Sequence, residues 1–365
     1  MTALAELLAA LVRIDSVNPD LVDGAAGEAE IARFVARWVE EAGLDVEVEE
    51  VAPGRFNTVG IVRGSGGGRT LLLNAHLDTV GVAGMERPFE PEVRDGRLQG
   101  RGSYDMKAGL AAIMVAGAEA ARNGLRGDVI VTAVCDEEVA SSGTKRVAER
   151  YRADAAIVSE PTEMRLALAH KGFVGFEIEV AGRAAHGSRP DLGVDAIARM
   201  GHVLVRLEEL DERLRATPTH RLLGSGSLHG SLIEGGQEYS SYPERCLLKG
   251  ERRTIPGESL GLVEDELRAL LGDVDGETRV VLAREPFETP EEAEIARLVA
   301  RHADGPEIVG VPFWADSALL AAAGIPTVVF GPTGEGAHAV EEWVDLASVE
   351  RCAEIYTEVV RELCA

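Results

Sequence analysis

The segment V-I-V-T-A-V-C-D-E-E, residues 129–138, decides how the rest of the chain is interpreted. Its β-branched and apolar residues, Val129 to Val134, predict a buried strand. Three consecutive carboxylates, Asp136, Glu137 and Glu138, follow that strand. Burying one carboxylate without a partner is costly, and three neighbouring carboxylates also repel one another. We therefore expect something positively charged to face this strand end.

Other predicted strands and turns also end on groups that bind metals. The apolar run T-L-L-L-N-A-H-L-D-T-V carries His76 and Asp78, and A-D-A-A-I-V-S-E-P-T carries Glu160. A glycine-rich turn before a predicted helix carries Asp105, and a loop after the apolar run T-V-V-F-G carries His338. Any one of these groups could be a surface acid or a capped strand end. Because ligands bind at the carboxyl ends of strands in α/β sheets, we expect the groups to converge.

The order of elements predicts two domains, one inserted into the other. Apolar strands alternate with helices in the first part of the chain, which predicts an α/β domain with a central, mostly parallel sheet flanked by helices. After Lys171 the segment F-V-G-F-E-I-E-V alternates cleanly, and the elements follow the β-α-β-β-α-β order of a ferredoxin-like α+β sandwich. We predict a discontinuous domain, residues 1–171 and 286–365, interrupted by an inserted domain at 172–285.

A glycine-rich run, G-S-G-G-G-R at residues 64–69, has two possible explanations. A phosphate loop would end in Gly-Lys-Ser/Thr and lead into a helix, whereas this run leads into a predicted strand. We therefore interpret it as a hairpin turn.

Composition and charge exclude some classes of function. The 365 residues carry a formal net charge of -25, and a phosphate backbone needs a basic footprint, so we expect no nucleic-acid partner. No segment has the length and apolarity of a membrane span, and the N-terminus resembles an amphipathic helix more than a signal peptide. The four cysteines form no C-x-x-C pair, which fits a reducing compartment. We expect a cytoplasmic protein.

The candidate ligands indicate which cofactor to expect. Two imidazoles and several carboxylates, with no cysteine among them, suit zinc, and cobalt or manganese are also possible. Two divalent ions about 3.5–4 Å apart would offset the crowding of carboxylates, polarise a carbonyl and activate water.

These motifs resemble a family of dinuclear-zinc amidohydrolases and exopeptidases. The family includes acetylornithine deacetylase, succinyl-diaminopimelate desuccinylase, aminoacylase and glutamate carboxypeptidase. H-L-D-T-V is similar to its H-x-D-x-V element, G-R-G-S-Y-D-M-K-A-G to its G-x-G-x-x-D-x-K element, and D-E-E to its glutamate pair. S-E-P-T and A-H-A-V-E-E-W match two later elements. The resemblance covers nearly the whole chain in the right order.

The resemblance implies a role for each matching residue. One metal would be bound by His76 and Glu160, the other by Glu138 and His338, and Asp105 would bridge the two. Glu137 would be the general base, and Asp78 would orient His76. Adjacent carboxylates of a strand point to opposite sides, which would allow Glu137 and Glu138 different tasks.

The resemblance also assigns residues in the inserted domain, which it describes as a lid and dimerisation domain. G-R-A-A-H-G-S-R-P maps His186 to the residue that stabilises the oxyanion, often across a homodimer interface. E-R-R-T-I-P-G maps Arg253, rather than Arg252, to the residue that binds the substrate carboxylate. Two positions depart from the family: Ser240 stands where many deacetylases have Asn, and Gly81 stands where Pro is common.

The function implied is hydrolysis of the amide bond of a small N-acyl amino acid by metal-activated water. A carboxypeptidase or dipeptidase using the same site is the alternative within enzymes. A non-catalytic binding protein that kept the fold is the alternative outside them.

Overall fold

The computed structural model describes residues 2–365, which divide into two compact units. Unit 1 comprises Met1–Leu168, Thr289–Val309 and Ala315–Ala365, and unit 2 comprises Ala169–Glu288 and Gly310–Trp314. Unit 1 is therefore discontinuous, and unit 2 begins and ends slightly outside the predicted limits of 172 and 285. The strand Leu166–His170 continues from unit 1 into unit 2 at the first border, and the strand Phe287–Glu288 lies just inside unit 2 at its end.

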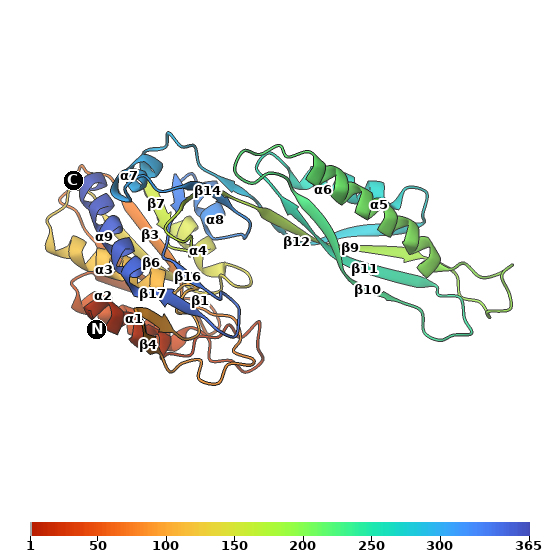
Figure 1. Ribbon diagram of the computed structural model, residues 1–365, viewed down its shortest axis with the longest axis horizontal. Coiled ribbons are helices and arrows are strands. Elements are labelled where there is room, and N and C mark those ends of the chain that lie inside the picture. Colours follow the sequence, from red (N-terminus) through yellow and green to blue (C-terminus); the bar gives the residue numbers. More distant parts are fainter. Residues whose placement is uncertain (1) are drawn as a thin grey trace. The chain divides into compact units, whose positions relative to one another are not determined.

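The central sheet of unit 1 has a parallel middle and antiparallel edges (Figure 1). Its strands follow the order β1-β2-β6-β3-β7-β15-β8-β13, with β14 beside β8. Strands β6, β3, β7 and β15 are parallel, whereas β1, β2, β8 and β13 pair antiparallel. The predicted α/β class with a mostly parallel centre is confirmed. The bounds are β1 Asp45–Ala52, β2 Arg55–Val62, β3 Leu71–His76, β6 Val129–Val134, β7 Ala155–Val158, β8 Leu166–His170, β13 Phe287–Glu288, β14 Ile308–Val311 and β15 Thr327–Val329.

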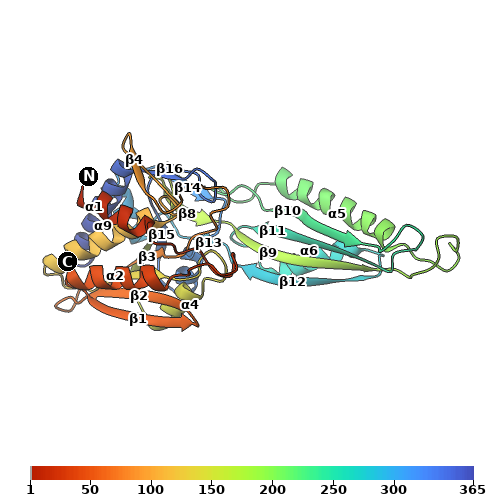
Figure 2. The ribbon, with the colours of Figure 1, turned by 90° about the horizontal axis from the view of Figure 1, so that it is seen from below.

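Helices cover both faces of this sheet, which explains why β3, β6 and β7 are buried along their whole length. Helix α3 connects β3 to β6 and α4 connects β6 to β7, and these crossovers run in opposite directions across the sheet. Right-handed crossovers in opposite directions place the two helices on opposite faces. Figure 1 shows α3 beside α9, with α4 and α8 across the sheet, and Figure 2 shows α2 along the β1–β2 hairpin. The helices of unit 1 are α1 Ala3–Val12, α2 Ala29–Glu41, α3 Lys107–Arg122, α4 Ser142–Arg150, α7 Glu294–His302, α8 Ser317–Ala322 and α9 Leu346–Leu363.

Gly109 lets α3 lie directly against the end of β7. A Cβ atom added at Gly109 would lie 2.1 Å from the carbonyl oxygen of Ser159, which no side chain tolerates. Ser159 immediately precedes Glu160, so this close contact fixes the height of α3 relative to one of the predicted metal ligands.

The glycine-rich run at residues 64–69 is not a hairpin turn, and that prediction was wrong. Strand β6 lies between β2 and β3, so the two strands that flank the run are not partners. The run packs by its backbone instead, because the amides of Ser65 and Gly66 donate to the carbonyl oxygens of Leu125 and Arg126.

A small second sheet in unit 1 holds two loops that matter for the site. Its order is β16-β17-β5-β4, and all its pairs are antiparallel. Strand β5 leads into the turn that carries Asp105, and the loop between β16 and β17 carries His338. Pairing of β5 with β17 therefore brings these two loops together. The bounds are β4 Glu92–Arg94, β5 Arg97–Gln99, β16 Gly334–Glu335 and β17 Trp343–Asp345.

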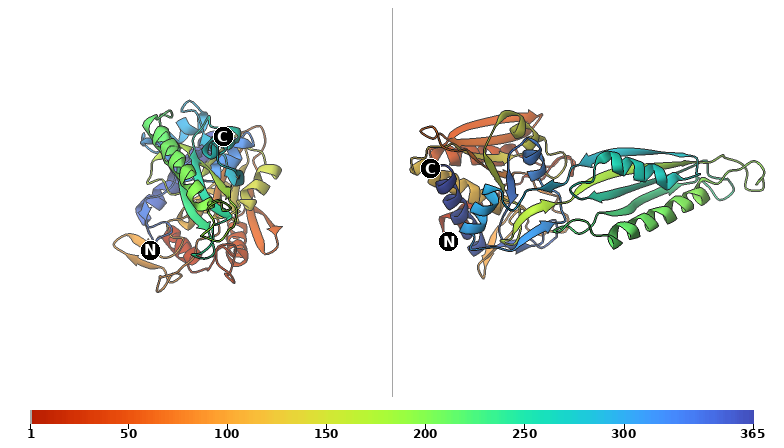
Figure 3. Two further views of the ribbon diagram at one scale, coloured as in Figure 1. Left: turned by 90° about the vertical axis from the view of Figure 1, so that its right-hand side faces the viewer. Right: turned by 90° about the horizontal axis from the view of Figure 1, so that it is seen from above.

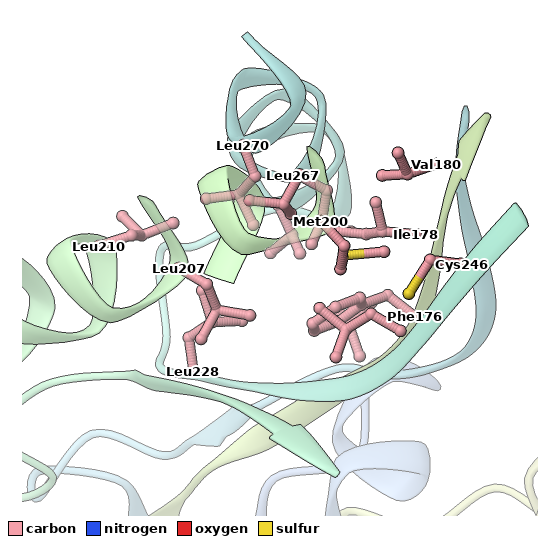
Figure 4. Packing of buried hydrophobic residues seen from close by; sticks show 14 of the residues in the cluster. Phe176, Ile178, Val180, Met200, Leu207, Leu210, Leu228, Cys246, Leu267 and Leu270 are labelled. Carbon is pink, nitrogen blue, oxygen red and sulfur yellow. The ribbon is translucent and has the colours of Figure 1, made fainter. Parts of the chain in front are cut away.

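Unit 2 is an antiparallel four-stranded sheet with two helices on one face (Figure 3). The chain order is β9-α5-β10-β11-α6-β12 and the sheet order is β10-β11-β9-β12, which is a ferredoxin-like arrangement. Alternate residues of β9, such as Phe176 and Ile178, pack against Met200 of α5 and Leu267 of α6 (Figure 4). The bounds are β9 Gly172–Ala181, α5 Ala196–Ala216, β10 Ser227–Gly235, β11 Arg245–Thr254, α6 Leu260–Leu271 and β12 Gly276–Arg284.

All four cysteines are buried free thiols. Within residues 2–365, none of the helices combines the length and the apolarity that crossing a bilayer requires.

Candidate metal centre

The five predicted metal ligands come together at one end of the parallel strands of unit 1. His76 is the last residue of β3, and Glu160 follows β7 by two residues. Glu138 lies in the turn after β6, Asp105 precedes α3, and His338 lies between β16 and β17. Their donor atoms form two groups, which are His76, Asp105 and Glu160, and Asp105, Glu138 and His338. Asp105 belongs to both groups.

Asp105 directs one carboxylate oxygen toward each histidine. Its Oδ1 lies 3.2 Å from Nε2 of His76, and its Oδ2 lies 3.3 Å from Nε2 of His338. Glu160 Oε1 lies 3.8 Å from His76 Nε2, and Glu138 Oε2 lies 3.2 Å from His338 Nε2. Each histidine nitrogen therefore faces two carboxylates, one of which is shared.

These separations fit donor atoms arranged around cations. Zinc binds nitrogen and oxygen at about 2.0–2.2 Å, so neighbouring ligands of a tetrahedral ion lie about 3.3 Å apart. The Nδ1 atom of His76 is 2.9 Å from the backbone carbonyl of Asp78, and because a carbonyl only accepts, Nδ1 carries the hydrogen. The lone pair of Nε2 then points at two carboxylates unless a proton or a metal ion lies between them. Among the described residues, the buried Oε1 of Glu138 has no hydrogen-bond partner. The groups present thus fit two divalent metal ions.

The pKa values of the acidic groups at this site also indicate that positive charge is missing there. Burial raises the pKa of Glu137 well above its ordinary value, and the charges of Glu160 and Asp316 add to that shift. Burial also raises the pKa of Glu160 and of Glu138. Hydrogen bonds to Asp105 and Glu138 raise the pKa of His338 to about 10. These raised pKa values mean that the glutamates and His338 bind protons more readily in the metal-free protein, where bound cations would otherwise balance the charge.

Asp316 is a buried acid of this region that the sequence did not point out. It precedes α8, and burial raises its pKa to about 6. Its Oδ2 accepts from Thr144 Oγ1 at 2.5 Å. Asp316 lies between Trp-Ala and Ser-Ala, and these neighbours form no motif that would indicate a functional acid.

Glu137 and Glu138 lie in a turn after β6 and not in the strand itself. The prediction that strand alternation would point their side chains to opposite sides was therefore wrong. Strand β6 ends at Val134, and both glutamates lie in the turn that follows. The fully buried carboxylate of Asp78 holds this turn by accepting from the amides of Glu137 at 3.1 Å and Glu138 at 3.2 Å. Asp78 thus connects the end of β3 with the turn after β6, besides lying next to His76.

Asp136 has a counter-charge that the sequence did not reveal. Arg55 at the start of β2 donates from Nη2 to Asp136 Oδ1 at 3.1 Å, and it also pairs with the buried carboxylate of Glu28. Asn18 donates to Asp78 at 2.8 Å and to Asp136 at 3.4 Å. The only signal for Arg55 was a charge beginning an otherwise apolar strand, and no motif in the sequence marks Asn18.

His186 and Arg253 both belong to unit 2. His186 lies in the loop between β9 and α5, and its Nδ1 is 2.9 Å from Ser188 Oγ. That loop is paired with the segment containing Ser240, because the amide of Gly187 donates to the Ser240 carbonyl at 2.6 Å. Arg253 lies in β11 and donates to Glu251 at 2.7 Å.

Arg252, the neighbour of Arg253, differs from it in both burial and partners. Its side chain is fully buried and pairs with the carboxylates of Glu258 and Glu266. The guanidinium of Arg252 is therefore fully used by contacts inside unit 2.

Comparison with known proteins places these observations in a family. Residues 72–362 match Peptidase family M20/M25/M40. The chain is 30% identical to acetylornithine deacetylase of Myxococcus xanthus over 100% of the chain and 98% of that protein. It is 28% identical to acetylornithine deacetylase of Proteus mirabilis (strain HI4320) over 98% of the chain and 96% of that protein. Among solved structures, aminopeptidase PepT from Bacillus cereus superposes with a TM-score of 0.81 at 19% identity, covering 99% of this chain and 98% of that one.

The fold and the paired ligand groups thus define a metal-dependent hydrolase of amide bonds, in the broad class of metallopeptidases and deacetylases. The chain belongs to Peptidase family M20/M25/M40. The resemblance inferred from its motifs is confirmed.

The pKa of His338 gives a prediction for metal uptake by the metal-free protein. Because that pKa is raised to about 10, His338 holds a proton at pH 7, and a metal ion must displace it. Affinity for zinc should therefore rise between pH 6 and pH 9, by about tenfold per pH unit for each proton displaced. Chelator competition across this range measures it. A His302→Gln control, at a surface histidine paired with Glu362, should keep the same slope, whereas an affinity that falls with pH would contradict the assignment.

Proposed function

We propose that this protein hydrolyses the amide bond of a small N-acyl amino acid at a dinuclear zinc centre. The observation that carries the proposal is Asp105, whose two carboxylate oxygens each face a different histidine. A shared carboxylate between two otherwise separate ligand groups is suited to bridging two ions. In this assignment one ion is held by His76, Glu160 and Asp105, and the other by Glu138, His338 and Asp105.

Zinc is the proposed metal because the donors are two imidazoles and three carboxylates at separations suited to it. Cobalt and manganese accept the same donors. Bound divalent ions supply polarisation of the substrate carbonyl and a lowered pKa of water.

Glu137 is proposed as the general base. It lies in the same turn as Glu138, and its amide is fixed by Asp78. Its carboxylate would accept a proton from the attacking water and then donate that proton to the leaving amine. The high pKa that burial gives Glu137 would fall when cations bind nearby, which leaves the carboxylate ionised and able to act as a base.

Two residues of unit 2 are proposed to act on the substrate. His186 would donate to the oxyanion, and Arg253 would bind the substrate carboxylate through its planar guanidinium. Arg253, whose side chain is 32% exposed, is preferred to Arg252, whose buried guanidinium is already paired with two carboxylates. Ser240, on the segment paired with the His186 loop, would stand where many deacetylases have Asn.

A homodimer through unit 2 is part of the proposal. Strand β10 is an edge of its sheet and is exposed along most of its length. It carries Leu232 and Ile233, which are 60% and 52% exposed, and α5 exposes Val205 at 55%. An unpaired strand edge next to exposed apolar side chains is suited to pairing with an identical copy. A cytoplasmic location is also proposed, since the four cysteines are free thiols.

Replacing Glu137 with Gln tests the assignment of the base. The variant should lower kcat by about 10²–10⁴-fold, because proton transfer is lost while the ligands remain. Metal analysis should find as much zinc in the variant as in the wild type. Glu149→Gln, at a mostly exposed residue of α4, is the matched control and should keep wild-type kcat. A Glu137→Gln protein with wild-type turnover would overturn the role of Glu137.

A panel of substrates separates the deacylase from a peptidase that uses the same site. N-acetyl and N-succinyl amino acids are compared with dipeptides, after zinc or cobalt has been added back. The proposal predicts a kcat/KM at least about tenfold higher for an N-acyl amino acid than for any dipeptide. The reverse order would favour a dipeptidase or carboxypeptidase. Absence of turnover together with absence of bound metal would favour a non-catalytic binding protein.

A further inference from the structure

The turn that carries Asp105 is organised around a buried carboxylate outside the ligand set. Glu342 is 3% exposed and immediately precedes β17. Its Oε1 accepts from the amides of Tyr104 at 2.9 Å and Asp105 at 3.0 Å. Its Oε2 accepts from the amide of Gly102 at 2.9 Å. Three backbone N–H groups of one turn therefore converge on a single side chain.

An arginine completes the surroundings of Glu342. Arg101 donates from Nη1 to Glu342 Oε2 at 2.7 Å, and both side chains are buried. Its Nη2 donates to the carbonyl oxygen of Ala339 at 2.8 Å. Ala339 is the neighbour of His338, so Arg101 connects the Asp105 turn to the His338 loop on one side while neutralising Glu342 on the other.

The backbone joins the same two segments. The amide of Gly100 donates to the carbonyl oxygen of Glu342 at 3.1 Å, and Gln99 pairs with Trp343 between β5 and β17. Residues 99–105 and 338–343 are thus held together by hydrogen bonds that do not involve the side chains of the proposed metal ligands. Within this framework Asp105 Oδ2 lies 3.3 Å from His338 Nε2.

We propose that Glu342 is a positioning residue that sets Asp105 against His338 before any metal ion binds. The inference rests on the proposed function, because it takes Asp105 as the shared ligand. Glu342 itself belongs to neither group of candidate donor atoms. It acts by fixing the backbone of Asp105, whose amide it accepts, so that each Asp105 oxygen faces its own histidine. Groups that orient metal ligands typically change metal affinity by about 10–100-fold when they are lost.

Three variants test this role. Glu342→Gln keeps the size of the side chain but presents an NH₂ group where amide N–H groups and Arg101 now donate. Glu342→Asp keeps the charge beside Arg101 but draws the carboxylate away from the three amides. Glu341→Gln is the matched control, because Glu341 is adjacent in sequence and exposed.

Metal affinity is the decisive measurement, made by chelator competition on metal-free protein whose folding is checked by circular dichroism and thermal unfolding. The wild type and Glu341→Gln should bind two zinc ions per chain with equal affinities. Both Glu342 variants should bind at least one ion about 10–100-fold more weakly. The visible absorption spectrum of the cobalt-loaded protein should also change in both, which a loss of stability alone would not cause.

The outcomes separate this inference from the proposed function. If the wild type binds no divalent metal, the proposed function fails. If the wild type binds two ions and the folded Glu342 variants bind them with wild-type affinity and spectrum, only the positioning role is overturned. If Glu342→Asp cannot fold although it keeps the charge beside Arg101, Glu342 is required for the fold as a whole and the specific role is again overturned.

Discussion

The crowding of carboxylates at one edge of the unit 1 sheet is the constraint on which the site depends. Asp105, Glu138 and Glu160 converge there with Glu137 nearby, and burial raises the pKa of each of the three glutamates. Leaving an uncompensated charge in such a place is strongly destabilising. Two histidines, His76 and His338, belong to the same groups of donor atoms. The charge balance therefore comes from protons in the metal-free protein and from divalent ions when these are bound.

The acids proposed as metal ligands differ from the acids that hold the surrounding turns in place. Asp136 is paired with Arg55, and Glu342 is paired with Arg101, so each of these carboxylates has a buried guanidinium beside it. Asp78 instead accepts from two backbone amides of the turn after β6 and from the side chain of Asn18. These framework acids hold the turns, and the remaining carboxylates stay available for cations. The close packing of α3 at Gly109 adds a steric limit at the end of β7.

The sequence pointed to the five candidate ligands, which the structure brings together, because each lies at or just after a strong pattern. Buried strands such as β3 and β6 are long apolar runs, and the residues that end them are easy to locate. The four short strands of the second sheet contain only two or three residues each, too few for any periodicity to show. Arg101 and Glu342 escaped notice because they are 241 positions apart, and only the pairing of β5 with β17 makes them neighbours. The glycine-rich run was misinterpreted because the two strands that flank it, β2 and β3, both pair with β6, which comes later in the chain.

Anomalous diffraction from crystals grown with zinc would show whether two divalent ions share Asp105. Two anomalous peaks about 3.5–4 Å apart are expected, one on the side of His76 and Glu160 and one on the side of Glu138 and His338. Asp105 should contact both peaks, with one oxygen on each. A single peak that Asp105 does not touch, or an absence of peaks at these residues in zinc-saturated crystals, would contradict that sharing.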